Sequence, residues 1–174
     1  LLNFNMSCIK PDYIKILETI DIKPYLKFLK TQPVNWNHGF NKWHQRDQVF
    51  INVQAFPLMD EYKIFPLYDE FYKISSPLRK ILKKHYGEGK FYKVHFSRMT
   101  HKSECKKHMD RGGDFLNAHR IHIPLKTNNK VVLEIGDKQF TPKVGRMFEV
   151  NNSKLHTVKV GGKRERLTLI VDYL

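Results

Sequence analysis

Strand-like alternation dominates the second half of the chain and is the feature that most restricts its fold. Over residues 92–97 and again over 120–124, apolar and polar side chains alternate with a period of two, as expected of half-buried β-strands. Turn-forming residues separate four further predicted strands, namely residues 130–135, 146–150, 155–160 and 167–173. Six or more short strands at this spacing predict a small barrel or a two-sheet sandwich.

The first 89 residues carry a different pattern. Apolar residues recur at helical spacing over 14–20 and over 25–29, on either side of Pro24, so we predict two short helices. A clearer helix is predicted after Ser76 as N-cap and before Gly87 as terminator, with proline at its first position. These features predict a mainly β protein with N-terminal helices.

Aromatic residues are dense between the predicted helices, over residues 33–72, where Pro57 and Pro66 interrupt any long helix. Short strands and loops fit this segment best. Aromatic side chains interleaved with lysine are compatible with a base-stacking platform for nucleic acid. The same side chains serve as the apolar cover of a neighbouring sheet, and we favour that interpretation.

A chain of 174 residues is long enough for one domain with a substantial core and short for two. We therefore predict a single domain over 1–174, in which residues 1–89 pack on a β core formed by 90–174. The apolar stretches are too short to span a bilayer and the N-terminus lacks a signal-peptide pattern, so we expect a soluble, cytoplasmic protein with no membrane partner. Cys8 and Cys105 lie far apart without CxxC spacing, which argues against a zinc site built on thiolates.

The chain is strongly basic, with 31 lysine and arginine residues against 17 acidic ones and a formal net charge of +14. Such a charge favours loose attraction to polyanions. Only eight of the 31 cations are arginine, the residue better suited to bidentate phosphate or base recognition. A lysine-coated surface is therefore favoured, and specific nucleic-acid binding stays as an alternative.

A candidate metal site comes from the His108-Met109-Asp110 tripeptide together with the distant His156. On an extended segment, residues i and i+2 project to the same side, so His108 and Asp110 can reach one ion while a second strand contributes His156. Two imidazoles and one carboxylate on one face of an octahedron are the ligands of non-haem Fe(II) oxygenases. The alternative is that these are ordinary surface or core histidines, since the chain has nine.

Arg166 strengthens the case for an oxygenase. It begins the last predicted strand, and the alternation places it on the face opposite Leu167, Leu169 and Val171. A planar guanidinium binds a carboxylate through two parallel charge-assisted hydrogen bonds, so it can hold the distal carboxylate of 2-oxoglutarate. The alternative is a solvent-facing arginine on an edge strand.

In sequence the run from Lys93 to Tyr173 resembles the aspartyl/asparaginyl β-hydroxylase family of Fe(II)- and 2-oxoglutarate-dependent oxygenases, in a microbial or viral branch. Four pieces match in order: residues 94–99, the His108 segment, residues 120–125, and residues 145–167. The resemblance implies a double-stranded β-helix core, which is cupin-like or jelly-roll in type, with Fe(II) and 2-oxoglutarate bound inside its open end.

The same resemblance implies roles for individual residues. His108 and His156 are similar to the metal histidines, and Arg166 to the anchor of the co-substrate carboxylate, with Ser97 assisting. Arg120 and His122 are similar to family residues that reach the co-substrate or the substrate, and His119 competes with His122 for that role. Animal members lack a carboxylate ligand, whereas Asp110 completes the triad in this chain.

The activity implied is hydroxylation coupled to oxidative decarboxylation of 2-oxoglutarate by dioxygen, with release of succinate and carbon dioxide. A small amino acid or a peptide is the expected substrate. A non-oxygenase metal cupin and a basic nucleic-acid binder remain alternatives. For substrate contact we single out four upstream residues, Trp36, His38, Trp43 and Arg46, and for closure over the substrate the glycine-containing residues 111–114.

Overall fold

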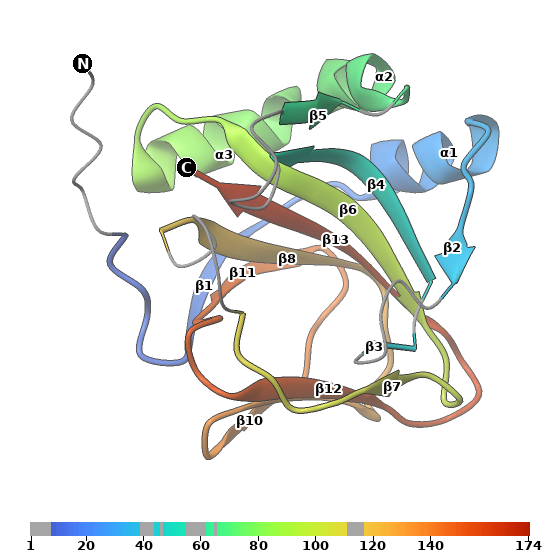
Figure 1. Cartoon of the computed structure of the whole chain (residues 1–174), viewed down its shortest axis with the longest axis vertical. Helices are drawn as coiled ribbons and strands as arrows, with labels where there is room; N and C mark the ends of the chain where they lie inside the picture. Colours follow the sequence, from blue (N-terminus) through green and yellow to red (C-terminus); the bar gives the residue numbers. More distant parts are fainter. Residues whose placement is uncertain (1–7, 39–43, 46, 55–61, 65, 111–116) are drawn as a thin grey trace.

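The computed structural model describes residues 8–38, 44–45, 47–54, 62–64, 66–110 and 117–174; for residues 37–64 and Glu104 the description covers the backbone (Figure 1). Strands form two layers that face each other, and helices cover the outer face of the larger layer. None of the helices within these ranges is long and apolar enough to span a membrane.

The larger layer is a sheet in the order β1-β11-β8-β13-β6-β4-β2, with β5 paired to β4. Every pairing in it is antiparallel. In sequence order its strands are β1 (Ile14–Thr19), β2 (Asn37–His38), β4 (Asp47–Gln54), β5 (Tyr62–Ile64), β6 (Phe91–Met99), β8 (His119–Lys126), β11 (Arg146–Val150) and β13 (Arg166–Tyr173).

The smaller layer is a three-stranded sheet in the order β10-β9-β12, and a separate two-stranded ladder joins β3 to β7. Its apolar residues form a second core with residues of the larger sheet, among them Met99, Phe148 and Val150. The strands are β3 (His44–Gln45), β7 (Glu104–Cys105), β9 (Val131–Ile135), β10 (Lys138–Phe140) and β12 (His156–Val160).

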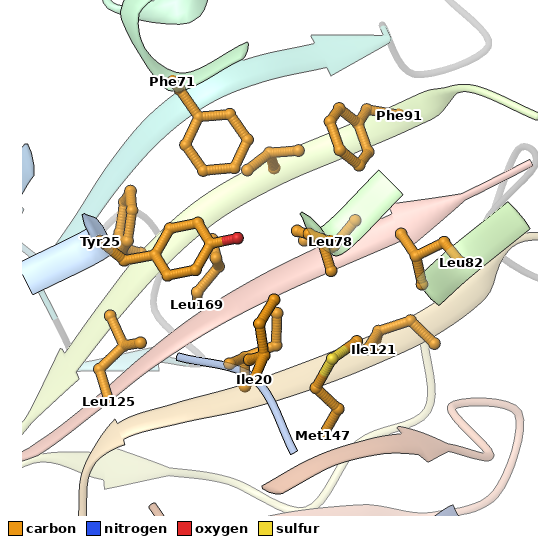
Figure 2. Close-up of a cluster of buried hydrophobic side chains, with 14 of the residues drawn as sticks. Ile20, Tyr25, Phe71, Leu78, Leu82, Phe91, Ile121, Leu125, Met147 and Leu169 are labelled. Carbon is orange, nitrogen blue, oxygen red and sulfur yellow. The ribbon is translucent and has the colours of Figure 1, made fainter. Parts of the chain in front are cut away.

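Three helices, α1 (Lys23–Thr31), α2 (Tyr68–Ile74) and α3 (Ser76–Tyr86), pack on the outer face of the larger sheet. Figure 2 shows Leu78 and Leu82 of α3 on the same side of the sheet as Ile121 of β8, and Phe71 of α2 beside Phe91 of β6. All five side chains are buried. This core fixes the outer face of β8 and β13, so their other face is turned toward the space between the layers.

The strands predicted from the alternation after residue 90 are confirmed. Helix α1 confirms the helix predicted over 25–29, and α3 the one predicted before Gly87, although Ser75 rather than Ser76 is the cap. The helix predicted over 14–20 is wrong, because this segment is strand β1, antiparallel to β11. The spacing of its apolar residues is compatible with the period of a helix and with that of a strand. A helix this short is only marginally stable alone, whereas a strand here gains backbone hydrogen bonds from β11.

Strands from both sides of residue 90 share the larger sheet. That the whole chain is a single domain stays a prediction. Of the aromatic segment, Trp36 and Tyr68 are partly buried against the core and Phe71 lies within it, as expected of an apolar cover. The side chains of residues 37–65 lie outside the description.

Candidate active site

Alternation along β13 divides its side chains between two environments. Leu167, Leu169 and Val171 join the helix-covered core, as predicted. Arg166 and Thr168 therefore project from the other face of the strand, toward the smaller sheet. The alternative of an exposed arginine on an edge strand is wrong, because β13 lies between β6 and β8 and Arg166 is only 2% exposed.

His108 and His156 lie side by side because their backbones are paired. The amide of His108 donates to the carbonyl of His156 at 3.0 Å, and the amide of His156 donates back at 2.8 Å. A further bond, from the amide of Asp110 to the carbonyl of Asn152 at 3.0 Å, continues this pairing. The tripeptide is thus fixed to the start of β12, and the two imidazole centroids lie 4.4 Å apart.

Both imidazoles are oriented by backbone carbonyls. Nδ1 of His108 lies 2.8 Å from the carbonyl of Lys106, and Nδ1 of His156 lies 2.9 Å from that of Lys154. A carbonyl only accepts, so each Nδ1 donates its proton to the backbone, and each Nε2 is the atom left to face a metal ion, which would displace any proton carried there. The Nε2 atoms lie 3.5 and 3.7 Å from the carboxylate oxygens of Asp110. Three donor atoms therefore converge on one point.

The charges around this point are strongly coupled. Burial and nearby charges act on the pKa of Asp110 in opposite directions, and Arg120 with the two histidines holds it well below the usual value. Burial opposes the charged form of His108, yet its contacts with Asp110 and neighbouring groups raise the pKa to about 9. Burial lowers the pKa of His156. The site therefore holds an ionised carboxylate beside the two imidazoles, a ligand set that suits a divalent cation.

Arg120 connects the candidate ligand Asp110 to a second buried carboxylate. Its guanidinium donates to Asp172 through Nε at 2.7 Å and through Nη2 at 2.9 Å, and its Nη1 donates to Asp110. Asp172 projects from the same face of β13 as Arg166 and is fully buried. Arg120 thus holds Asp110 in place, and its contact with a co-substrate stays a prediction.

The surroundings of Arg166 contain polar side chains from β6 and β13. Ser97 on β6 pairs in register with Thr168 on β13, and Arg166 pairs with Met99. The hydroxyls of Ser97 and Thr168 are buried without a hydrogen-bond partner, and Nη1 of Arg166 contacts the Met99 sulfur at 3.8 Å. Unsatisfied buried hydroxyls are costly. Two of them beside a buried guanidinium fit a carboxylate, so the residues present suit both groups: a divalent cation at the triad and a dicarboxylate here.

His119 and His122 lie on different sides of β8. The ring of His122 packs 5.4 Å from that of Phe148, which belongs to the core between the sheets. His119 instead stacks on Tyr86 of α3, on the helix-covered side. Of the two competing candidates, His122 is therefore the one that shares the inner face with Arg120.

Thr168 and Asp172 are site residues that the sequence interpretation missed. The signal was available, because both lie at even spacings from Arg166 on a strand whose alternation was recognised. Of the upstream candidates, Trp36 lies against the guanidinium of Arg98, 4.3 Å from the ring centroid. The side chain of His38 and the residues Trp43, Arg46 and 111–114 lie outside the described parts of the chain.

Comparisons with known proteins agree with this geometry. The profile of the aspartyl/asparaginyl beta-hydroxylase family matches residues 54–174. No curated protein sequence matches the chain.

Solved structures with a similar fold share little sequence with the chain. An oxidoreductase of the 2OG-Fe(II) oxygenase family from Burkholderia pseudomallei is 15% identical, with a TM-score of 0.63, over 86% of this chain and 76% of that one. A viral collagen prolyl hydroxylase from Paramecium bursaria Chlorella virus-1 is 13% identical, with a TM-score of 0.56, over 93% and 96%. A prolyl-4-hydroxylase from Pseudomonas putida is 12% identical, with a TM-score of 0.57, over 93% and 92%.

These likenesses confirm the predicted double-stranded β-helix core, and the profile covers more than half of the chain. The chain belongs to the aspartyl/asparaginyl β-hydroxylase family.

Proposed function

We propose that the protein is an Fe(II)- and 2-oxoglutarate-dependent dioxygenase that hydroxylates an amino acid or a peptidyl residue. The observation that carries the proposal is one inner face that presents two separate sites. One is a converging His108, Asp110 and His156 set, and the other is the buried Arg166 with two unpaired hydroxyls. A metal cupin of another class needs the first of these sites and has no use for the second.

His108, Asp110 and His156 would hold the iron through two Nε2 atoms and one carboxylate, and leave three coordination positions open. Arg166, Ser97 and Thr168 would bind the distal carboxylate of 2-oxoglutarate. Bound together, iron, 2-oxoglutarate and dioxygen supply the oxidative decarboxylation that yields succinate, carbon dioxide and a hydroxylated product. The residues of this chain contribute placement of the two groups and imidazole rings oriented by the backbone carbonyls of Lys106 and Lys154.

A free amino acid or a peptide is the substrate class that we propose. Two of the similar structures are prolyl hydroxylases, which supports a peptidyl or amino-acid substrate without naming it. The net charge of +14 leaves nucleic acid as a candidate that must be included in any screen.

The test is succinate release with ferrous iron and air across a panel of free amino acids, peptides and oligonucleotides. We expect one class of substrate to raise succinate formation above the level measured without any substrate. Mass spectrometry should show that the substrate has gained one oxygen atom. The His156→Ala variant should be inactive, and His101→Ala, which changes an exposed histidine, should be as active as the unaltered protein. Absence of iron-dependent succinate formation with every substrate class would refute the proposal.

A further inference from the structure

A second group of metal-binding side chains lies on the opposite face of the larger sheet from His108 and His156. His119 begins β8, Glu149 is on β11, and Cys8 belongs to the segment that precedes β1. The three candidate ligand atoms lie within 4.8 Å of one another. Tyr86 of α3 stacks on His119, which places the group under the helix layer and away from the proposed iron site.

The distances within this group are close to those of a tetrahedral zinc site. Nδ1 of His119 lies 2.8 Å from Oε1 of Glu149, and Sγ of Cys8 lies 3.3 Å from Nδ1 and 3.5 Å from Nε2. Zinc bond lengths place tetrahedral N and O donors roughly 3.3 Å apart and N and S donors roughly 3.6 Å apart. Because Sγ lies almost equally far from the two ring nitrogens, the His119 ring would have to rotate toward it, and the Glu149 carboxylate would have to move by about half an ångström, to admit an ion.

The environment of Glu149 also calls for a cation. Its carboxylate is only 1% exposed, and its second oxygen accepts a hydrogen bond from the Tyr86 hydroxyl at 2.9 Å. A buried carboxylate is costly unless a positive charge lies beside it. In the absence of metal, Nδ1 of His119 lies beside this carboxylate at 2.8 Å, and a metal ion would take the place of that hydrogen bond.

We propose that Cys8, His119 and Glu149 bind a zinc ion, with a fourth coordination position left for water. One thiolate and one carboxylate neutralise the two charges of the ion, and the mixture of sulfur, nitrogen and oxygen donors suits zinc better than magnesium or calcium. The proposal is independent of the oxygenase activity. It departs from the expectation drawn from cysteine spacing, because the ligands come from three distant segments that sequence spacing cannot relate.

Lys10 is the cation that competes with this ion. Its ammonium donates to the carbonyl of Ala118, next to His119, and lies close enough to interact with Cys8 and Glu149. Its charge opposes a metal ion, so Lys10→Gln should tighten zinc binding. If Lys10 instead served as the permanent counter-ion of Cys8 and Glu149, the same variant would bind no more zinc than the unaltered protein.

The consequence of an ion at this position is a cross-link. It would join the segment before β1 to β8 and β11, whereas the backbone ladder of β1 is formed with β11. Because the ion binds only the folded chain, a zinc concentration one hundred times the Kd should raise the Tm by roughly 5–10 °C.

The test uses a chain in which the iron site is disabled by the double substitution His108→Ala and His156→Ala. In this background we expect one zinc ion per chain by elemental analysis after dialysis. Substitution with cobalt(II) should give the intense near-ultraviolet absorption of a thiolate-to-cobalt charge transfer, which neither histidine nor carboxylate produces. The band reports on the thiolate directly and does not depend on any variant at the new site.

The two cysteines of the chain provide a matched pair of controls. Cys8→Ser should abolish the cobalt band and lower zinc affinity at least tenfold, whereas Cys105→Ser should retain both. His119→Gln should weaken binding in the same way as Cys8→Ser, with circular dichroism confirming that each variant is folded. Zinc absent from the double variant, or a cobalt band that survives Cys8→Ser, would overturn the proposal.

Discussion

At the scale of single residues, the site joins two arginines with different tasks. Arg120 already has two buried carboxylates, Asp110 and Asp172, as partners. Arg166 contacts the Met99 thioether and shares its strand face with Thr168, whose hydroxyl has no hydrogen-bond partner among the described residues, and we propose that it binds the co-substrate. The two guanidiniums should therefore respond to substitution in different ways.

Replacing Arg166 by alanine should weaken 2-oxoglutarate binding about tenfold to one-hundredfold or more, because a charge-assisted pair is worth roughly 1.5 to 3 kcal/mol. The measurement is calorimetric titration of 2-oxoglutarate into the anaerobic Fe(II) protein. Arg146→Ala, which removes an exposed arginine from β11, is the control and should leave the affinity unchanged. Equal affinities in the two variants would remove Arg166 from the pocket.

Thr168→Val should have different effects on the stability of the protein and on its affinity for 2-oxoglutarate. Valine keeps the shape of threonine but removes a buried hydroxyl that has no partner, so the free energy of unfolding should stay constant or rise by up to about 1 kcal/mol. Affinity for 2-oxoglutarate should fall several-fold, because the hydroxyl would bond the carboxylate. Urea unfolding and the same calorimetric titration test the two halves, and a loss of both would assign Thr168 a merely structural role.

Asp172→Asn should be strongly destabilising, because it leaves a buried arginine without half of its counter-charge. Removing one partner of such a pair costs about 3–5 kcal/mol. Asp137→Asn, which changes an exposed carboxylate, is the matched control and should stay within about 0.5 kcal/mol. Affinity for Fe(II) should also fall in Asp172→Asn, since Arg120 would no longer be held against Asp110. An unchanged urea midpoint would contradict this account.

At the scale of elements, the sequence pattern predicted secondary structure correctly where the apolar residues fitted either the helical or the strand period but not both. Alternation after residue 90 identified β6, β8 and β13, and a proline start with a glycine end identified α3. The pattern failed for β1, whose apolar positions fit both periods and whose conformation depends on β11, a partner far away in the chain. It also missed short strands such as β10, because three residues are too few to show a period.

Within α3, burial rather than helix propensity should decide stability. Leu78 is fully buried against the sheet, so Leu78→Ala should lower the free energy of unfolding by about 2–5 kcal/mol through lost contacts and a cavity. Lys80→Ala, on the exposed face of the same helix, should change it by no more than about 0.5 kcal/mol. Comparable urea midpoints for the two variants would show that α3 does not support the sheet.

At the scale of the whole molecule, the sequence motif around His108 identified candidate metal ligands, whereas the residues that contact them could be found only from the fold. Spacing of i and i+2 sufficed to group His108 with Asp110, and alternation along a later predicted strand offered His156. Nothing local could relate Arg120 to Asp172, which is 52 residues away, or Cys8 to His119, which is 111 away. Such pairs depend on the strand order of the sheet, which alternation does not encode.

Ending the chain after Gly162 should abolish cooperative folding. The truncation removes β13, which lies between β6 and β8 and carries both Arg166 and Asp172 (Figure 1). Without it the larger sheet loses the strand that joins β6 to β8, and the helix-covered core loses Leu167, Leu169, Val171 and Tyr173. Near-ultraviolet circular dichroism and urea titration should show no sigmoidal transition. A cooperative transition in the shortened chain would show that the remaining strands can close the gap.

The inner position of β13 has a consequence for how the chain is made. Strands β6 and β8 leave the ribosome before the strand that separates them, and until it arrives each presents an open edge. The nascent chain therefore passes through a period in which the unpaired edges of β6 and β8 are accessible to neighbouring polypeptides or chaperones. Slow translation between Lys126 and Arg166 would prolong that exposure, so codon choice in this stretch should influence the yield of active protein.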